Sequence, residues 1–137
     1  MAFHLQIVTP EGKAFEDEVN SVVLPGALGE MGILTSHANL VSTLLPGELR
    51  YTKEGKETEM AIGGGFAEIT GDHVNVLTDM AVHDSQIDEA AVEAALSRAQ
   101  ERLSEPGLTL PEEVAAVEAA IANSMAALKL KRKRRAL

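Results

Sequence analysis

Apolar and polar residues alternate along the first 84 residues with a period of about two. In the segment 3–8, Phe3, Leu5 and Ile7 occupy every second position, which is the pattern of a strand with one buried face. Further short apolar runs lie between turn signals at residues 19–24, 39–45, 49–52, 60–62, 66–70 and 74–77. Many short strands separated by turns rich in Gly and Pro predict an antiparallel β-sandwich or barrel.

From residue 85 onward the period becomes helical and alanine is frequent. The segment 85–88 (Ser-Gln-Ile-Asp) is a variant of a capping box, so we expect a helix from there to about Ser104. Thr109 as a cap, with Pro111 in the first turn, predicts a second helix. One apolar stripe of that helix carries Val114, Val117, Ile121 and Leu128. The short linker predicts an antiparallel helical hairpin, which divides the chain into a sandwich domain at 1–84 and a hairpin with a basic tail at 85–137.

The surface that joins the two helices is expected to be thin. Its facing stripes consist mostly of alanines, namely Ala91, Ala94, Ala95, Ala99, Ala116, Ala120 and Ala127. Alanine favours each helix individually but buries little apolar area between helices. The hairpin is therefore either an element that can detach or an ordinary stable appendage.

Length and composition limit the class of protein. A chain of 137 residues can build one core and one appendage. It has no cysteine, and its four histidines lack the spacing of a metal site. No apolar run approaches the roughly 20 residues of a membrane helix, and the N-terminus lacks the features of a secretory signal. We expect no cofactor, no metal, a reducing compartment and no direct insertion into the membrane.

Charge is segregated along the chain, whose formal net charge is -9. Half of the 12 basic residues lie at the C-terminal end: Lys129, Lys131, Arg132, Lys133, Arg134 and Arg135. Such a tail is either a solvated end or a segment that meets an acidic partner. A nucleic-acid partner is not expected, because the chain has only four aromatic residues and no tryptophan on which bases could stack.

The segment 22–41 contains the most specific combination of residues in the chain. A strand-like run stops at Pro25, and glycines recur at 26, 29 and 32 around the single carboxylate of Glu30. Glycines at this spacing indicate a shaped loop that presents Glu30. A tight turn whose glycines serve only the fold is the alternative. A single exposed carboxylate without a paired acid or nucleophile makes a poor active site, so no catalytic residue is expected.

From Gly26 to Ala38 the chain follows the pattern G-x-x-G-E-x-G-I-L-x-x-H-A. This pattern resembles the signature of the epsilon subunit of the F-type ATP synthase, although Thr35 and Ser36 stand where the family usually has Pro-Gly or Pro-Asn. The resemblance extends over essentially the whole chain. It implies a flattened β-sandwich of about ten strands followed by the helical hairpin. It also implies a non-catalytic rotor subunit of the central stalk, which joins gamma to the c-ring and inhibits ATP hydrolysis through its C-terminal helices.

The resemblance also implies the partners of individual segments. Glu30, Met31, Gly32, Ile33 and Leu34 would lie against the c-ring, and His37 and Ala38 would contact gamma. The basic tail would bind an acidic segment of the beta subunits when the hairpin extends. The implied location is peripheral, on the cytoplasmic face of the bacterial inner membrane. The alternative is a free-standing sandwich adaptor whose hairpin dimerises and whose tail binds an acidic partner or RNA.

Two further motifs bear on nucleotide binding. Some epsilon subunits bind ATP through I/L-D-x-x-R-A; Ile87 and Asp88 match this motif, but Ala91 stands at the arginine position. Without a guanidinium to hold the phosphates, we expect ATP to bind at millimolar concentration or worse. The glycines at 63–65 lack the lysine and hydroxyl of a phosphate-binding loop. We expect a bulge or a close crossing of strands there.

Overall fold

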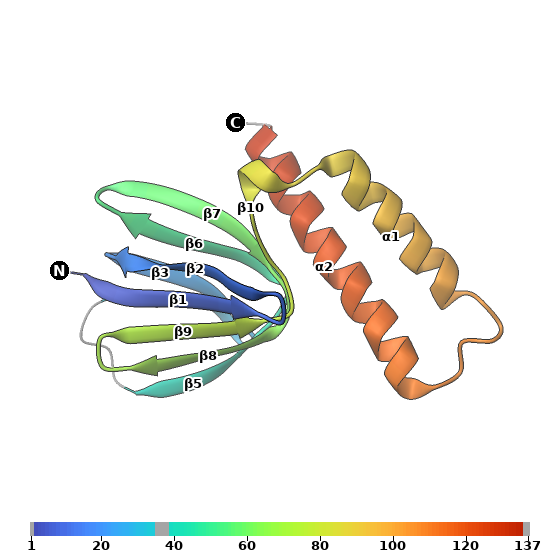
Figure 1. Ribbon diagram of the computed structural model, residues 1–137, viewed down its shortest axis with the longest axis horizontal. Coiled ribbons are helices and arrows are strands. Elements are labelled where there is room, and N and C mark those ends of the chain that lie inside the picture. The colour runs from blue at the N-terminus through green and yellow to red at the C-terminus, as the bar shows by residue number, and fades with distance from the viewer. Residues whose placement is uncertain (1, 35–38, 136–137) are drawn as a thin grey trace.

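A computed structural model of the chain describes residues 2–34 and 39–135. Its strands lie side by side, and two helices extend away from one end of them (Figure 1). The strands are β1 (Phe3–Thr9), β2 (Gly12–Val19), β3 (Ser21–Gly26), β4 (Gly29–Ile33), β5 (Leu40–Leu44), β6 (Gly47–Lys53), β7 (Lys56–Ile62), β8 (Gly65–Thr70), β9 (His73–Thr78) and β10 (Ala81–His83). A 3₁₀ turn, η1 (Asp84–Gln86), leads into α1 (Glu89–Leu103) and α2 (Pro111–Arg135).

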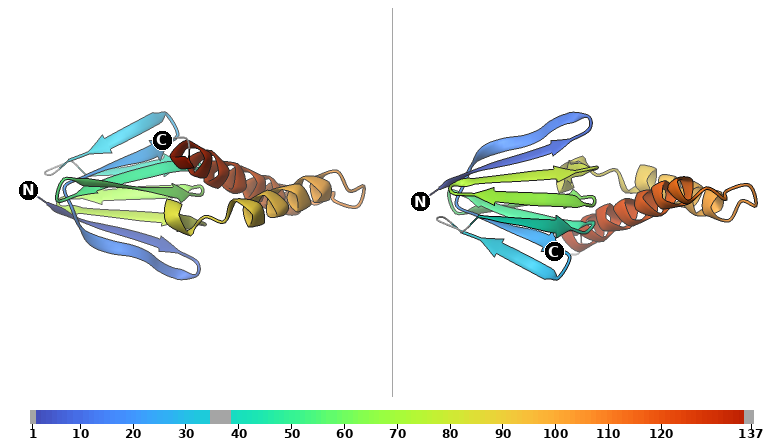
Figure 2. Two further views of the ribbon diagram at one scale, coloured as in Figure 1. Left: turned by 90° about the horizontal axis from the view of Figure 1, so that it is seen from above. Right: turned by 90° about the horizontal axis from the view of Figure 1, so that it is seen from below.

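The ten strands form one sheet that folds over on itself as a sandwich. Their order is β10-β7-β6-β3-β5-β8-β9-β1-β2, and β4 pairs with the outer side of β3. In both views of Figure 2 the hairpins β1–β2 and β3–β4 lie on opposite sides of the other strands. The predicted β-sandwich of about ten strands with a helical hairpin is confirmed. One pairing departs from the antiparallel pattern, because β1 runs parallel to β9.

The core lies between the two layers and follows the period of two. Phe3, Leu5 and Ile7 of β1 are buried, while the residues between them remain partly exposed. The other core residues come from β2–β9: Val19, Val22, Leu24, Ile33, Leu44, Leu49, Tyr51, Met60, Ile62, Ala67, Ile69, Val74 and Val76. The layers also meet where the Phe15 ring of β2 stacks on Tyr51 of β6, with their centroids 4.4 Å apart.

Two strands differ from the sequence expectation. Strand β2 was not predicted, because its acidic sequence buries only Val19 completely. The glycine segment was expected to be a loop, but Gly29–Ile33 is strand β4, paired with β3 through Pro25 and Gly26. Gly29 has φ +126°, and a Cβ at Gly26 would lie 2.8 Å from the Gly29 carbonyl oxygen. These glycines therefore close a two-residue hairpin turn instead of shaping a longer loop.

Each helix begins a few residues from where the sequence suggested. Asp88 is the N-cap of α1, and its side chain accepts a hydrogen bond from Ala91 N at 3.1 Å. In α2, Val114 N donates to the carbonyl of Leu110 at 3.0 Å, which makes Leu110 the N-cap in place of Thr109. Pro111 then occupies the first helical position, where its missing N–H has no consequence.

The helices are held unequally. No residue of α1 is buried, whereas α2 buries Val117, Ala127, Leu128 and Leu130. In Figure 1, α2 lies between α1 and the sandwich. Of the seven alanines of the expected stripe, Ala127 alone is buried, and Ala91, Ala94, Ala116 and Ala120 are exposed. The alanines therefore bury little area, and the buried large side chains of α2 are Val117, Leu128 and Leu130. No helix in the described part of the chain is long and apolar enough to span a bilayer.

The glycines at 63–65 mark a close crossing of chain segments. A Cβ at Gly65 would lie 1.9 Å from the Leu77 carbonyl oxygen, and one at Gly63 would lie 1.8 Å from Oδ1 of Asp79. At Gly65 the obstacle is backbone, so only glycine fits there, whereas at Gly63 the side chains of Asp79 and Asn123 would have to move. Asp79 in turn accepts a hydrogen bond from Nδ2 of Asn123 at 3.0 Å, which ties α2 to this corner of the sandwich.

Candidate interaction surfaces

The tip of the β3–β4 hairpin is exposed. Leu28 in its turn is fully exposed, whereas Leu34, which is 66% exposed, follows the other end of β4, away from the turn. The Glu30 side chain is also exposed and accepts a hydrogen bond from Nη1 of Arg50 at 2.9 Å. Ile33, in contrast, is 1% exposed and belongs to the core. The tip thus presents the apolar side chain of Leu28 near one carboxylate, and Leu34 is exposed at the opposite end of the hairpin.

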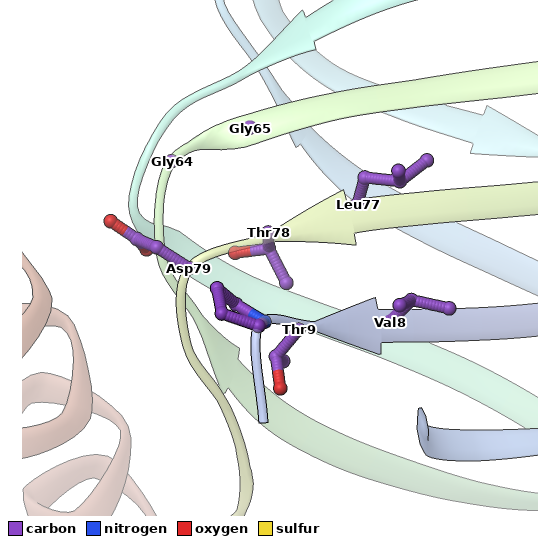
Figure 3. Close-up of a pocket in the computed structure, with 8 residues that line it drawn as sticks. Val8, Thr9, Gly64, Gly65, Leu77, Thr78 and Asp79 are labelled. Atoms are coloured by element: carbon purple, nitrogen blue, oxygen red, sulfur yellow. The ribbon is translucent and has the colours of Figure 1, made fainter. Parts of the chain in front are cut away.

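A row of apolar side chains crosses the outer face of β8, β9 and β1. Phe66 of β8 lies opposite Leu77 of β9, which lies opposite Val8 of β1. Phe66 and Leu77 are 44% and 40% exposed, and Val41 on the neighbouring strand β5 is 65% exposed. Val8 and Leu77 line a hollow of about 370 Å³ at the end of this row (Figure 3). The row itself is apolar and is not covered by either helix, whereas the same face also carries the polar side chains of Glu68 and Asn75.

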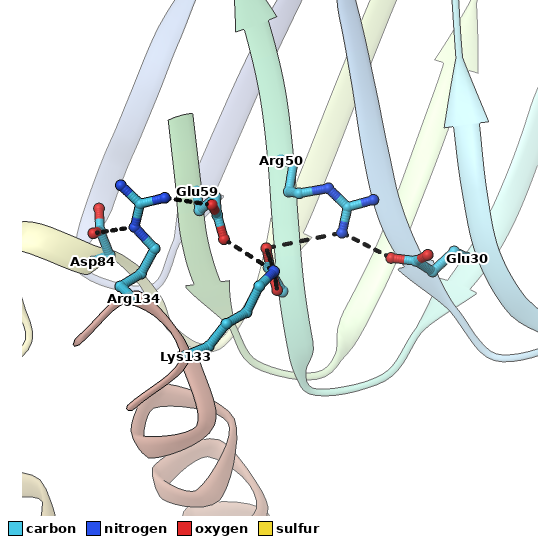
Figure 4. Close-up of polar contacts among 7 residues, drawn as sticks. Glu30, Arg50, Glu59, Asp84, Lys133 and Arg134 are labelled. Atoms are coloured by element: carbon cyan, nitrogen blue, oxygen red, sulfur yellow. Dashed lines mark hydrogen bonds and ion pairs between the residues drawn. The ribbon is translucent and has the colours of Figure 1, made fainter. Parts of the chain in front are cut away.

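The C-terminal end of α2 is joined to the sandwich by an ion-pair network (Figure 4). Nζ of Lys133 donates to both carboxylate oxygens of Glu48, at 3.0 and 3.1 Å, and lies 3.4 Å from Glu59. Nη1 of Arg134 lies 2.9 Å from Glu59, and its Nε lies 3.3 Å from Asp84. The network therefore joins residues that are 50 to 85 positions apart in the sequence.

On the sandwich side the network continues along β6. Arg50 lies 3.8 Å from Glu48 and 2.9 Å from Glu30. It also lies directly opposite Glu59 across the β6–β7 pair. Charges of opposite sign thus alternate from the tip of β3–β4 to the end of α2.

The two central carboxylates of the network have opposite pKa shifts. Burial and the nearby Glu59 carboxylate raise the pKa of Glu48. The hydrogen bond with Glu48, followed by the charge of Lys133, lowers the pKa of Glu59 despite its burial. The hydrogen bond to Glu48 raises the pKa of Lys133. If this site takes up a proton, Glu48 receives it, while Glu59 stays charged and needs the cations of α2.

Comparison with known proteins identifies the family. Residues 2–84 match the model of the ATP synthase delta/epsilon chain β-sandwich domain. The ATP synthase epsilon chain of Desulforamulus reducens is 46% identical over 103 residues, which cover 75% of this chain and 78% of the relative. That of Shouchella clausii is 37% identical over 117 residues, or 85% and 88% of the two chains. The chain belongs to the ATP synthase epsilon family.

An epsilon chain is a non-catalytic subunit of ATP synthase. A solved Euglena gracilis mitochondrial ATP synthase, comprising OSCP, F1 and c-ring, contains a similar chain with a TM-score of 0.70 and 26% identity. That match covers 90% of this chain and 78% of the other. A chain in the central stalk and c-ring structure from Tetrahymena thermophila shares the fold, with a TM-score of 0.58 and 12% identity. Family membership replaces the alternative of a free-standing adaptor.

The incomplete ATP motif of this epsilon chain lies at one hollow. Ile87, Asp88 and Ala91 all line a space of about 320 Å³ between the two helices and the end of the sandwich. Its other lining residues are Met80, Val82, Gln86, Val92, Ala95, Ser124 and Ala127. None of these lining residues carries a positive charge. Asp88 is the only charged one, and it would repel a triphosphate.

The remaining expected contacts are distributed unevenly. His37 and Ala38, expected at gamma, lie outside the described residues. Within the basic tail, Lys133 and Arg134 belong to the network, and Lys131 donates to the Asp84 carbonyl at 3.3 Å. Arg132 pairs with Glu93 of α1 at 2.7 Å. Lys129 is exposed, and no ion pair to it is found among residues 2–34 and 39–135.

Sequence reasoning missed the carboxylates that receive the tail. Glu48, Glu59 and Asp84 were not singled out, because an acidic residue on a strand ordinarily faces water. Glu59 precedes the apolar run 60–62 and shares its strand face with Ala61, which is completely buried. The position of Glu59 on the same strand face as Ala61 was the signal that could have indicated a buried carboxylate. The basic tail alone showed only that some acidic partner was needed.

Proposed function

We propose that this epsilon chain is a rotor component of the central stalk of a bacterial F-type ATP synthase. In this role it joins gamma to the c-ring at the cytoplasmic face of the inner membrane, and its C-terminal hairpin slows ATP hydrolysis. The observation that supports the proposal is that the two parts of the molecule differ in their surfaces and packing. A rigid sandwich bears uncovered apolar surfaces, and a lightly packed hairpin bears a dense basic end.

The contact with gamma is proposed on the outer face of β5, β8 and β9. In the sequence, only Asn39 separates Ala38 from β5, and Val41 of β5, Phe66 of β8 and Leu77 of β9 are exposed. Exposed apolar side chains that form a continuous row are typical of a protein interface. The contact with the c-ring is proposed along β4, through Glu30, Met31, Gly32 and Leu34, with Leu28 of the preceding turn added to the expected set. Ile33 supports β4 from the core.

Inhibition is proposed to require release of the hairpin from the sandwich. The side chains that would reach an acidic segment of the beta subunits are Lys129, Lys131, Arg132, Lys133, Arg134 and Arg135. In the compact form, Lys133 and Arg134 are already occupied by carboxylates of the sandwich. An extended form is therefore a second state of the same chain, which differs from the compact one in its ion pairs.

Co-purification tests the rotor assignment. Phe66→Glu and Leu77→Glu should abolish recovery with gamma, because each places a charge in the proposed apolar contact. Leu110→Glu is the matched control, since Leu110 is 51% exposed but lies at the far turn of the hairpin. Loss of gamma in all three variants, or in none, would contradict the proposed surface. Circular dichroism of each variant confirms that the sandwich is intact.

ATP hydrolysis tests the inhibitory role. An epsilon-depleted F-type ATPase is titrated with the full chain and with residues 1–84. We expect only the full chain to slow hydrolysis. If both bind and neither changes the rate, the protein is a coupling spacer with a passive hairpin.

A further inference from the structure

The sandwich has more negative charge than it can neutralise at the place where α2 ends. Glu30, Glu48, Glu59 and Asp84 lie along this edge, and Arg50 is the cation of β6 that reaches two of them. Glu48 and Glu59 are diagonal neighbours across the β6–β7 pair. Like charges at this spacing repel one another. Lys133 and Arg134 supply two further cations, which bring the site to three cations against four carboxylates.

Burial strengthens the ion pairs that hold the hairpin against the sandwich. The Glu59 side chain is only 7% exposed while α2 packs over it, so in the compact form its charge is offset mainly by the two cations of α2 and little by water. Beside it, Leu130 of α2 packs against Ala61 in a small apolar cluster, and both are almost fully buried. The ion pairs are therefore partly shielded from solvent and from salt.

We propose that Glu48, Glu59 and Asp84 form an internal receptor for Lys133 and Arg134, a latch that holds the hairpin against the sandwich. Its regulatory consequence rests on the proposed inhibitory function. The cations in the latch belong to the set proposed to bind the acidic segment of beta. One pair of side chains cannot occupy both sites. Binding to the sandwich and binding to beta are therefore mutually exclusive, and the latch sets how readily the hairpin is released.

This competition predicts that removing the anion and removing the cations of the latch have different effects on inhibition. Glu59→Gln weakens the latch but leaves the tail basic, so the released tail is free to act on beta. Lys133→Gln with Arg134→Gln also weakens the latch, but it removes the charges that beta would bind. Both changes should release the hairpin, and only the first should strengthen inhibition. Lys129→Gln is the matched control, because it removes one tail charge that lies outside the latch.

Release can be measured directly on the full chain. The chain has no native cysteine, so Thr70→Cys and Glu118→Cys can carry spin labels on exposed positions of β8 and α2. Pulsed electron–electron double resonance then gives the distance distribution between the sandwich and the hairpin. We expect one narrow distance in the parent chain and in the Lys129→Gln variant. Glu59→Gln and the Lys133→Gln/Arg134→Gln double variant should raise the released population by about tenfold or more.

The latch and the inhibitory function fail in different ways. A narrow, unchanged distance in the Lys133→Gln/Arg134→Gln variant would overturn the latch, whatever the hydrolysis assay shows. That variant leaves the sandwich sequence intact, so misfolding of the Glu59→Gln variant cannot obscure the result. If Glu59→Gln releases the hairpin but hydrolysis by an epsilon-depleted ATPase is unaffected, the latch stands and the inhibitory function is wrong. Release together with at least several-fold stronger inhibition supports both.

Discussion

The sandwich and the hairpin are stabilised by different forces. Sandwich strands bury a continuous set of large apolar side chains, many of them completely. In the hairpin, α1 contributes only the partly buried Val92, and α2 contributes Ala127 and Leu130, to the small cluster shared with the sandwich. The end of α2 is held instead by charge. One region is therefore specified by its core, and the other is attached by contacts that can be exchanged.

The largest expected effect comes from the sandwich core. Leu24→Ala removes a completely buried side chain and should lower the free energy of unfolding by about 2–5 kcal/mol. Urea denaturation followed by circular dichroism measures this loss. Leu130→Ala, at an equally buried position of α2, should instead speed hydrogen exchange of α2 amides and leave the sandwich transition in place. An equal fall of that transition in both variants would show that the two regions unfold as one unit.

A smaller effect is expected where the chain crosses itself. Gly65→Ala places a methyl group against the Leu77 carbonyl and should destabilise the sandwich by about 1–3 kcal/mol. Gly64→Ala is the control, because its Cβ would meet nothing closer than 3.8 Å. Thermal unfolding of the two variants measures the difference. Equal stability of the two variants would mean that this corner of the sandwich is looser than the geometry indicates.

Ion pairs on the exposed surface of the sandwich should affect stability much less than the ion pairs of the latch affect release of the hairpin. Glu16, 2.7 Å from Nε2 of His4, raises the pKa of that histidine by hydrogen bonding. The resulting stabilisation is complete below the unfolded-state pKa of about 6.5 and is lost as pH rises through the higher folded-state pKa. Melting temperature should fall slightly over that interval in the parent chain and not in His4→Gln. A fall of the same size in His4→Gln would assign the effect to another group.

The smallest expected effect is that of ATP on the hairpin. The hollow lined by Ile87, Asp88 and Ala91 offers no cation to a triphosphate, so isothermal titration should give a dissociation constant in the millimolar range or weaker. Ala91→Arg supplies the missing guanidinium and should tighten binding. Low-micromolar binding by the parent chain would show that a nucleotide, and not the latch alone, can fasten the hairpin.

The sequence predicted those parts of the molecule whose structure depends on residues close together in the chain. The alternation of Phe3, Leu5 and Ile7 predicts β1, because burial on one face repeats every two residues. Strand β4 could not be recognised in this way, since its glycines suggest a turn until a partner strand is known. The latch was also out of reach. Glu59 and Lys133 become neighbours only after α2 returns to the sandwich, and no local pattern of residues encodes that return.

The route by which the hairpin leaves the sandwich has a mechanical consequence. Strand β10 has only three residues, Ala81–His83, paired at the edge of the sheet with Met60–Ile62. A force that pulls the helices away from the sandwich therefore separates β10 from β7 one residue pair at a time. The long strands of the sandwich are not sheared. The pair nearest the helices, His83 with Met60, would separate first. The Tyr51 hydroxyl lies 3.2 Å from Nε2 of His83 and stabilises this pair. Peeling all three residues adds about 10 Å of tether, at roughly 3.3 Å per residue, while the sandwich core stays closed.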